Sequence, residues 1–414
     1  MAPPAPAPSV RAMTSSPLRV VVAGGGIAGI EALLSLHALA GDRVDLTLAD
    51  AQRDFVYRPM TVAEPFARGI ARRHPIAAFA ADVGARLVAD NITEVDPIDR
   101  VARTAGGEAL RYDALLLATG AGAVPAFANA LTWDDRSGPD HLGGLLRDLE
   151  QGFLRRLAFV VPRGPGWPLP AYELALMTAR RAWEVQTGAT ITLVTPEVAP
   201  LAIFGRRATE AVRGELEAAH VGFYTGVDVS IEKAHALTVV VHPGSRRIEV
   251  DRVVALPRLV GRAPAGIPCD EDGFVHVDAQ CQVTAVDHVW AAGDGIAFPV
   301  KFGGLAADQA DAAAEAIAQL AGADVTPEPF KPVLRGRLLT WRGERYMHHV
   351  AGGGGGDGEV ADHALWWPPG KVAGRRLAPY LAERDEAAAV GHEPPPAGLT
   401  VQTDLTREFA AKPV

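Results

Sequence analysis

The sequence predicts an α/β protein with two doubly wound, parallel-sheet units and a small α+β domain at the C-terminal end. Three observations lead to this prediction. An apolar strand runs directly into a glycine-rich turn and a helix at residues 20–39, and a second strand, turn and helix follow at 157–183. A further apolar strand, residues 289–292, ends in Gly293-Asp294 far downstream. Strands that alternate with helices in this way build parallel sheets covered by helices.

The first glycine turn has the spacing Gly-x-Gly-x-x-Gly. In such a turn the first glycine permits a tight bend, the second lets the backbone approach a pyrophosphate, and the third lets the helix pack on the strand. The helix, expected over 30–39, would point free N–H groups and the positive end of its dipole at the phosphates. The residues expected to contact a dinucleotide here are Gly24, Gly26, Ile27, Ala28 and Gly29.

The next strand, residues 44–50, ends in an acid that is predicted to bind a ribose. Asp50 lies 21 residues after Gly29. A carboxylate about 20 residues beyond the fingerprint accepts a hydrogen bond from a ribose hydroxyl. One departure is Leu33, which stands where a small residue is usual. Taken alone, the segment also fits a glycine-rich turn in an ordinary α/β protein.

Composition and charge narrow the class of protein. A chain of 414 residues with 48% hydrophobic residues can form two or three domains with cores of their own. A net charge of −9 and the lack of a basic run argue against nucleic-acid binding. The two cysteines, Cys269 and Cys281, are too few for a disulfide-stapled secreted protein. No apolar run approaches the roughly 20 residues of a membrane span, so we expect a cytoplasmic protein, at most peripheral to the inner face of the membrane.

The remaining elements follow from strand-like and helix-like runs. Three short runs at 92–95, 101–104 and 110–112 predict a small antiparallel meander, because turn residues separate them. A buried strand over 113–120 then ends at Thr119-Gly120. The other expected strands are 157–162, 191–195, 237–241, 248–255, 273–278, 333–340 and 345–350, and the other expected helices are 171–183, 305–320 and 372–383. The glycine run 352–356 is expected to be a hairpin connection.

These elements predict a domain order in which the first unit is discontinuous in the chain. Residues 1–16 are rich in proline and alanine and are expected to form a disordered tail, with either Met1 or Met13 as the start. The expected domains are a cofactor-binding unit of 17–125 with 265–322, a second nucleotide-binding-like unit of 126–264, a C-terminal domain of 323–387 and a disordered tail of 388–414.

With both glycine segments placed, residues 18–320 resemble the FAD-dependent pyridine nucleotide–disulfide oxidoreductase superfamily. The most similar branch contains sulfide:quinone oxidoreductases and type II NADH dehydrogenases, and 330–383 is similar to the C-terminal domain of that branch. The resemblance implies two Rossmann-like folds and a bound FAD. It also implies that Asp294 binds a ribityl hydroxyl and that the helix near Gly304-Leu305 points its N-terminus at the flavin. The further cofactor contacts implied are Arg58, Ala118, Thr119, Gly120, Asp294, Gly304 and Leu305.

Lys301 is a candidate catalytic residue. A reduced flavin carries negative charge on one edge, and a positive charge beside it would stabilise the reduced form. Lys301 matches the lysine in a Pro-Lys-Thr-Gly segment of sulfide:quinone oxidoreductases, and lysine is rare in this chain. The alternative is an ordinary solvated loop lysine.

The chain departs from this branch in its second glycine turn, residues 163–170. The sulfide enzymes have a redox cysteine there, and this turn has none. Neither Cys269 nor Cys281 matches the family's redox positions, so we expect no redox cysteine pair. The turn also makes a poor cradle for NAD(P)H, because Leu169 replaces the third glycine and Pro168 and Pro170 lack backbone N–H groups.

Other residues allow two interpretations. Glu173, at the start of a helix, is a second candidate catalytic residue that could move protons, or an acid that only satisfies the helix dipole. Glu197 could meet a ribose of a nicotinamide dinucleotide. The pair Trp366-Trp367 could face a lipid interface, or pack in the core or against a second copy in a homodimer. Neighbours on a strand face opposite ways, so His348-His349 predict no metal site.

The functional hypothesis is an FAD-dependent oxidoreductase that passes two electrons from a reduced donor through FAD to a quinone or another small-molecule acceptor. One alternative is an NAD(P)H dehydrogenase of the type II kind. Another is a flavin-binding sensor or assembly protein that no longer turns over.

Overall fold

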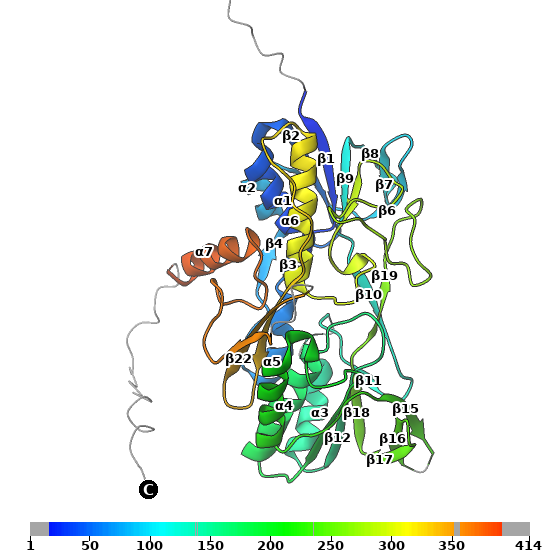
Figure 1. Cartoon of the computed structure of the whole chain (residues 1–414), viewed down its shortest axis with the longest axis vertical. Coiled ribbons are helices and arrows are strands. Elements are labelled where there is room, and N and C mark those ends of the chain that lie inside the picture. Colours follow the sequence, from blue (N-terminus) through cyan, green and yellow to red (C-terminus); the bar gives the residue numbers. More distant parts are fainter. Residues whose placement is uncertain (1–15, 137, 139, 235, 352–356, 391–414) are drawn as a thin grey trace, which may run out of the picture.

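A computed structural model describes residues 16–136, 138, 140–234, 236–351 and 357–390 of the chain (Figure 1). The expected N-terminal tail, apart from residue 16, lies outside the described residues, as do the glycine run 352–356 and residues 391–414 of the expected C-terminal tail. No helix within the described ranges is long and apolar enough to cross a membrane.

The first unit is built on a five-stranded parallel sheet in the order β20-β9-β1-β2-β5. Its strands are β1 (Leu18–Ala23), β2 (Val44–Ala49), β5 (Arg86–Val88), β9 (Ala114–Leu117) and β20 (Val289–Ala291). The residues of β1 from Val20 to Ala23 are at most 2% exposed. This explains the continuous apolar run, because a parallel strand is covered on both faces. Strand β20 pairs with β9, so the chain returns to this sheet after the second unit.

Helices cover one face of this sheet and a meander covers the other (Figure 1). On the helical face α1 (Ile27–Ala40) packs against α6 (Gly303–Leu320), with the short α2 (Ile76–Asp82) beside them. On the opposite face lies the predicted antiparallel meander of β6 (Ile92–Asp96), β7 (Val101–Thr104) and β8 (Ala109–Arg111). Helix α1 begins three residues earlier than expected from the sequence, directly after Gly26.

The second unit repeats this plan with the parallel order β11-β18-β12-β13-β14. Its strands are β11 (Leu131–Thr132), β12 (Arg156–Val160), β13 (Thr190–Val194), β14 (Gly222–Tyr224) and β18 (Arg252–Ala255). Its helices are α3 (Asp140–Glu150), α4 (Leu169–Glu184) and α5 (Arg206–Ala218). A three-stranded sheet of β15 (Asp228–Lys233), β16 (Leu237–His242) and β17 (Arg246–Val250) lies on the side of the parallel sheet that faces away from these helices (Figure 1). The fold class is therefore confirmed.

Two chain segments cross between the units side by side. Strand β10 (Ala121–Val124), on the way out, pairs antiparallel with β19 (Arg258–Gly261), on the way back. Near the first sheet, β3 (Asp54–Val56) pairs with β4 (Arg73–Pro75), and the 3-10 helix η2 (Arg58–Phe66) lies between them in sequence. The remaining short 3-10 helices are η1 (Gly41–Arg43), η3 (Ala202–Phe204) and η4 (Gly293–Gly295).

The C-terminal region has three antiparallel strands and one helix. The strands are β21 (Val333–Leu339), β22 (Glu344–Val350) and β23 (Glu359–Ala361), followed by α7 (Leu377–Val390). The expected helix start at Val372 is wrong by five residues. Residues 370–376, which we call the strap, are not helical, and the Glu31 carboxylate accepts hydrogen bonds from the N–H groups of Arg376 and Leu377 at 2.6 and 2.9 Å.

Two further expectations from the sequence are wrong. The segment 273–278 is not a strand of any sheet and forms only isolated bridges, such as Val275 with Ile296. Alternating apolar residues arise there because the segment packs against the edge of the core without a continuous partner. The expected C-terminal tail also begins too early, since α7 continues through Val390.

Candidate active site

One large cavity brings together both segments that the sequence singled out. Its volume is about 1110 Å³, and its lining includes the first glycine turn, Asp294, and parts of the second unit and of the C-terminal region. Drug-sized ligands occupy pockets of roughly 300–1,000 Å³. The cavity is therefore of a size to hold a dinucleotide. The predicted cofactor-binding residues that line it are Gly24, Gly26, Ile27, Ala28, Asp50, Arg58, Ala118, Thr119, Gly120 and Asp294.

The three glycines of the first turn have different structural requirements. A Cβ on Gly24 would lie 2.3 Å from the carbonyl oxygen of Ala118, and Gly24 has a φ of +115°. A Cβ on Gly29 would lie 1.7 Å from the carbonyl oxygen of Gly24. Gly29, also among the expected dinucleotide contacts, does not line the cavity, and its lack of a Cβ instead allows the helix to pack closely on the turn. A Cβ on Gly26 would meet no atom within 4 Å, because this position faces open space.

The N-terminus of α1 fits a phosphate group. Gly26 is the N-cap residue, no side chain caps the helix there, and the first turn contains no acid. The first N–H groups are thus left for a ligand, and the helix dipole favours an anion. Because no Cβ stands in front of these groups at Gly26, a pyrophosphate can reach them.

Asp50 stands at the end of β2 beside this turn. Its carboxylate accepts hydrogen bonds from the backbone N–H of Gly25 at 2.5 Å and from that of Gln52 at 2.6 Å. These bonds fix the carboxylate at the rim of the cavity, where the sequence predicted a ribose contact. Gly25 also lines the cavity; it belongs to the same glycine run but was not among the predicted contacts.

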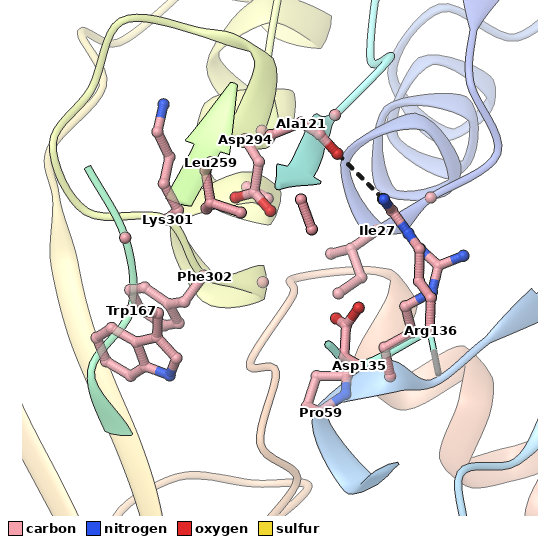
Figure 2. A pocket seen from close by; sticks show the side chains of 18 of the residues that line it. Ile27, Pro59, Ala121, Asp135, Arg136, Trp167, Leu259, Asp294, Lys301 and Phe302 are labelled. Carbon is pink, nitrogen blue, oxygen red and sulfur yellow. Dashed lines mark hydrogen bonds between the residues drawn. The ribbon is translucent and has the colours of Figure 1, made fainter. Parts of the chain in front are cut away.

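Asp294 reaches the same cavity from η4, directly after β20 (Figure 2). Partial burial raises the pKa of its carboxyl, and the positive charge of Lys301 opposes this shift. The Thr119 hydroxyl, across the cavity, donates a hydrogen bond of 3.0 Å to the carbonyl oxygen of Arg262. Asp294 is thus an acceptor in a partly dry site, suited to bind a ligand hydroxyl.

Lys301 is buried rather than solvated. It is 4% exposed, and its ammonium group donates to the carbonyl oxygen of Ile296 and lies 4.0 Å from the ring centroid of Phe274. Figure 2 shows the side chain directed away from Phe302. Burial lowers the pKa of Lys301 to about 8, and the charge of Asp294 opposes this shift. The catalytic role of Lys301 stays a prediction. Its positive charge acts on the Asp294 carboxylate, which lines the same cavity.

The pKa of Lys301 predicts how the stability of the protein depends on pH. Its folded value of about 8 lies below the ordinary 10.5, so between these values the unfolded chain binds more protons than the folded chain. We expect the free energy of unfolding to rise with pH in this window, and Lys301→Met to lack that rise. Urea unfolding at about pH 7.5 and about pH 10 measures it. The exposed Lys331→Met is the control, and an unchanged pH dependence in Lys301→Met would contradict the prediction.

The N-terminus of α6 also faces the cavity. The helix begins at Gly303 with Phe302 as its N-cap, and Gly303 and Ala306 line the cavity. The predicted contacts Gly304 and Leu305 do not line it, and Leu305 is 1% exposed in the core next to Phe302. The helix begins two residues earlier than expected, at Gly303 instead of Leu305, so the side of its first turn that faces the cavity carries Gly303 and Ala306.

The second glycine turn is fastened to the first unit. The N–H of Gly166 donates to the carbonyl oxygen of Pro299 at 3.0 Å, and the N–H of Lys301 donates to the carbonyl oxygen of Gly166 at 3.1 Å. Next to this bridge, the rings of Trp167 and Phe302 stack at 4.3 Å and 13° (Figure 2). The Gly166 amide is therefore already used, which leaves one donor fewer for a dinucleotide phosphate.

Glu197 is likewise engaged within the protein. Its carboxylate accepts hydrogen bonds from the hydroxyls of Tyr172 at 2.7 Å and Thr195 at 2.9 Å. Burial raises its pKa to about 7. Glu197 lines the cavity, but these two bonds already occupy one of its carboxylate oxygens.

Glu173 forms a buried ion pair that the sequence did not predict. Both of its oxygens accept hydrogen bonds from the Lys371 ammonium, at 2.6 and 2.7 Å, and one accepts the N–H of Leu339 at 2.9 Å. The two side chains are 1% and 5% exposed, and both residues line the cavity. Burial raises the pKa of Glu173 and lowers the pKa of Lys371. Burial thus disfavours both charges, and each group opposes the shift in the other's pKa by its own charge.

Lys371 and its neighbours were missed by sequence reasoning. Lys371 belongs to the strap, and the Tyr57 hydroxyl accepts a hydrogen bond from the N–H of Val372 at 2.9 Å. The chain has five lysines, so the rarity that singled out Lys301 applies equally to Lys371. No local motif surrounds it, and its partner Glu173 is 198 residues away.

The cysteines lie apart from the cavity. Cys269 is exposed, Cys281 is buried, and neither lines the cavity. Burial raises the pKa of the Cys281 thiol to about 12, which makes it a poor nucleophile.

Comparison with solved structures shows the same fold in several oxidoreductases. A sulfide:quinone oxidoreductase from Aquifex aeolicus matches with a TM-score of 0.71 at 16% identity, over 90% of each chain. A ferredoxin reductase from Rhodopseudomonas palustris matches with a TM-score of 0.60 at 21% identity, over 81% of this chain and 83% of that one. A water-forming NADH oxidase from Lactobacillus brevis matches with a TM-score of 0.56 at 14% identity, over 80% and 75%.

A sequence search among curated proteins found no match. The sequence profile of the pyridine nucleotide-disulphide oxidoreductases matches residues 18–319, which is most of the chain. That range contains the glycine turn, Asp50, Thr119-Gly120 and Asp294 around one cavity. The chain therefore belongs to the pyridine nucleotide-disulphide oxidoreductase family, and it is an FAD-dependent oxidoreductase.

Proposed function

We propose that the protein passes two electrons from a reduced donor through FAD to a quinone or a similar small-molecule acceptor, without a redox cysteine pair. The observation that carries this proposal is the buried Glu173–Lys371 pair in the wall of the cofactor cavity. Reduction of a quinone to a hydroquinone takes up two electrons and two protons. A bound, reduced FAD would supply the two electrons and one proton as a hydride, and the ion pair would supply the second proton to the acceptor.

The residues around the cavity have separate roles in this proposal. The N-terminus of α1 and Asp50 bind the dinucleotide part of the cofactor, and Asp294 binds a hydroxyl of its chain. The N-terminus of α6 and the charge of Lys301 stabilise negative charge on the reduced cofactor. The sulfide:quinone oxidoreductase from Aquifex aeolicus acts on a quinone, as its name states, and shares this fold.

Two observations favour a donor other than NAD(P)H. The second glycine turn has prolines at 168 and 170 and is bonded to residues 299–301, so few of its amides are left for a pyrophosphate. Glu197, the acid at the end of β13, is bonded to Tyr172 and Thr195. Both features support a second fold that covers the cofactor and does not bind a second dinucleotide.

The test is the visible spectrum of the holoprotein, recorded without oxygen before and after each donor. Under the proposal NADH and NADPH leave the oxidised flavin bands unchanged, whereas another reductant bleaches them, and a short-chain quinone then restores them. Rapid bleaching by NADH or NADPH would show an NAD(P)H dehydrogenase instead. Slow reduction by dithionite and by every donor would favour a flavin-binding sensor.

We expect neither cysteine to take part in the reaction. The double variant Cys269→Ser/Cys281→Ala should be reduced and reoxidised within about twofold of the wild-type rates, because neither thiol lines the cavity. Stopped-flow absorbance of the flavin gives both rates. Cys281→Ala alone serves as the control for a loss of core packing, and a loss of reduction specific to Cys269→Ser would refute the prediction.

A further inference from the structure

Several arginines line the cofactor cavity without an ion-pair partner among the described residues, and the charges of three of them act on one another. Arg58 comes from η2, Arg136 from the loop between β11 and α3 of the second unit, and Arg262 from the segment that returns to the first unit after β19. Within the described ranges none of the three forms an ion pair with a carboxylate. Burial lowers the pKa of the Arg262 guanidinium, and the charges of Arg136 and Arg58 lower it further. Like charges are therefore gathered at one side of a cavity, at a cost that an anionic ligand would offset.

Arg136 and Arg262 lie beside the residues that follow the Thr119-Gly120 turn. The Arg136 guanidinium donates to the carbonyl oxygen of Ala121 at 3.2 Å (Figure 2). A Cβ on Gly122 would lie 3.3 Å from Nε of Arg262. The two arginines thus flank neighbouring residues of β10, although 126 residues separate them in the chain.

This position is close to the glycine turn. The N–H of Ala118 donates to the carbonyl oxygen of Ala23 at 2.8 Å, and the Gly24 backbone touches that of Ala118. The ends of β1 and β9 are therefore adjacent. Residues 121–122, the first two of β10, come shortly after the end of β9 along the chain. Figure 2 shows Ile27, the first residue of α1, in the same part of the cavity as Arg136. β10, which both arginines contact, therefore begins shortly after a strand end that touches the glycine turn leading into α1.

Three acids, Asp134, Asp135 and Asp294, act on the charges of this cluster, but none forms an ion pair with its guanidinium groups among the described residues. Asp134 is bonded to the backbone N–H of Arg136 at 3.1 Å. Burial raises the pKa of the Asp135 carboxyl to about 6, although the charge of Arg58 opposes the shift. Asp294 faces the cavity with its own role toward a hydroxyl.

We propose that Arg136, from the loop after β11, and Arg262, from the segment that returns after β19, bind the pyrophosphate of FAD opposite the N-terminus of α1. The proposal rests on the FAD site described above. Guanidinium groups match phosphate geometry with paired N–H donors. On binding, the Arg136 guanidinium exchanges the carbonyl of Ala121 for a phosphate oxygen. The cofactor then holds the β11–α3 loop and the returning segment against α1.

The experiment measures the dissociation constant of FAD for the apoprotein by quenching of flavin fluorescence. Arg136→Gln keeps a hydrogen-bond donor for the Ala121 carbonyl but removes the positive charge. Arg262→Gln removes the charge of the second arginine in the same way. Each should weaken FAD about 10- to 100-fold, the effect of losing a charged hydrogen bond to phosphate. Arg136→Lys should recover part of the loss. Arg103→Gln, an exposed residue of β7 outside the cavity, is the matched control.

A second measurement separates pyrophosphate binding from a loss of structure. ADP carries the same pyrophosphate, so its ability to displace FAD should fall in Arg136→Gln as FAD affinity does. Added salt should weaken FAD binding less in Arg136→Gln than in the wild type. FAD affinity equal to that of Arg103→Gln, or an unchanged response to salt, would overturn the proposal. Wild-type protein that fails to bind FAD would instead refute the cofactor site itself.

Discussion

Gly26→Val should give a folded protein that purifies without flavin. A Cβ at position 26 meets no protein atom within 4 Å, and the backbone there, with φ of −81°, suits any residue. The added side chain would instead stand where a phosphate must approach the first N–H groups of α1. We expect FAD affinity to fall by at least about 100-fold, since several charged hydrogen bonds are lost together. The ratio of flavin to protein absorbance measures it.

The neighbouring glycines make the contrast that tests this explanation. Gly29→Ala would drive a methyl group into the Gly24 carbonyl, 1.7 Å away, so this variant should lose stability as well as flavin. Asp294→Ala should keep the fold and lose flavin, because it removes an acceptor without filling space. Full flavin occupancy in both Gly26→Val and Asp294→Ala would show that the site is misplaced.

Breaking the ion pair at Lys371 should have the largest effect on stability. Lys371→Met leaves the buried Glu173 carboxylate without its cation, and such losses cost about 3–5 kcal/mol. Without the cation the raised pKa of Glu173 rises further, so the folded protein binds a proton that the unfolded chain releases. The cost should therefore be smaller at about pH 5 than at about pH 8. Urea unfolding at the two values measures the difference.

Two variants accompany this measurement. Glu173→Gln/Lys371→Met leaves no buried charge and keeps an oxygen for the Leu339 N–H, so it should recover most of the stability. This double variant should retain flavin but reduce a quinone slowly, because the pair that supplies a proton to the acceptor has been removed. Glu108→Gln breaks the exposed Arg86–Glu108 pair and should cost at most about 1 kcal/mol. Quinone reduction at the wild-type rate in the double variant would exclude a proton role for the pair.

The parts of the site that lie close together in sequence could be predicted. Gly24, Gly26 and Gly29 act through a fixed spacing that sets the turn and the helix start, and the structure gives each the expected surroundings. Asp50 and Asp294 follow buried strands, and parallel strands bring their carboxyl ends to one edge of a sheet. For these residues, a local pattern and a general rule of sheet topology are sufficient.

Long-range contacts could not be predicted from one sequence. Lys371 and Glu173 meet only because the strap crosses from the C-terminal strands to α4 and α1, and neither has a neighbouring motif. The helix expected at Val372 begins at Leu377, where Glu31 accepts the first N–H groups from a distant part of the chain. The segment 273–278 alternates like a strand but has no continuous partner. In each case the deciding partner lies far away along the chain.

The place of β20 beside β9 has a consequence for how the protein is made. Asp294 and the strand before it are synthesised only after the whole second unit, yet they complete the sheet that carries the glycine turn. Domains fold as units while the ribosome proceeds, so the second unit, with all its strands between residues 131 and 255, can fold first. Until residue 291 has been synthesised, β9 has no β20 beside it, so that edge of the first sheet stays unpaired. A flavin site that includes Asp294 therefore cannot be complete before the second unit has been synthesised.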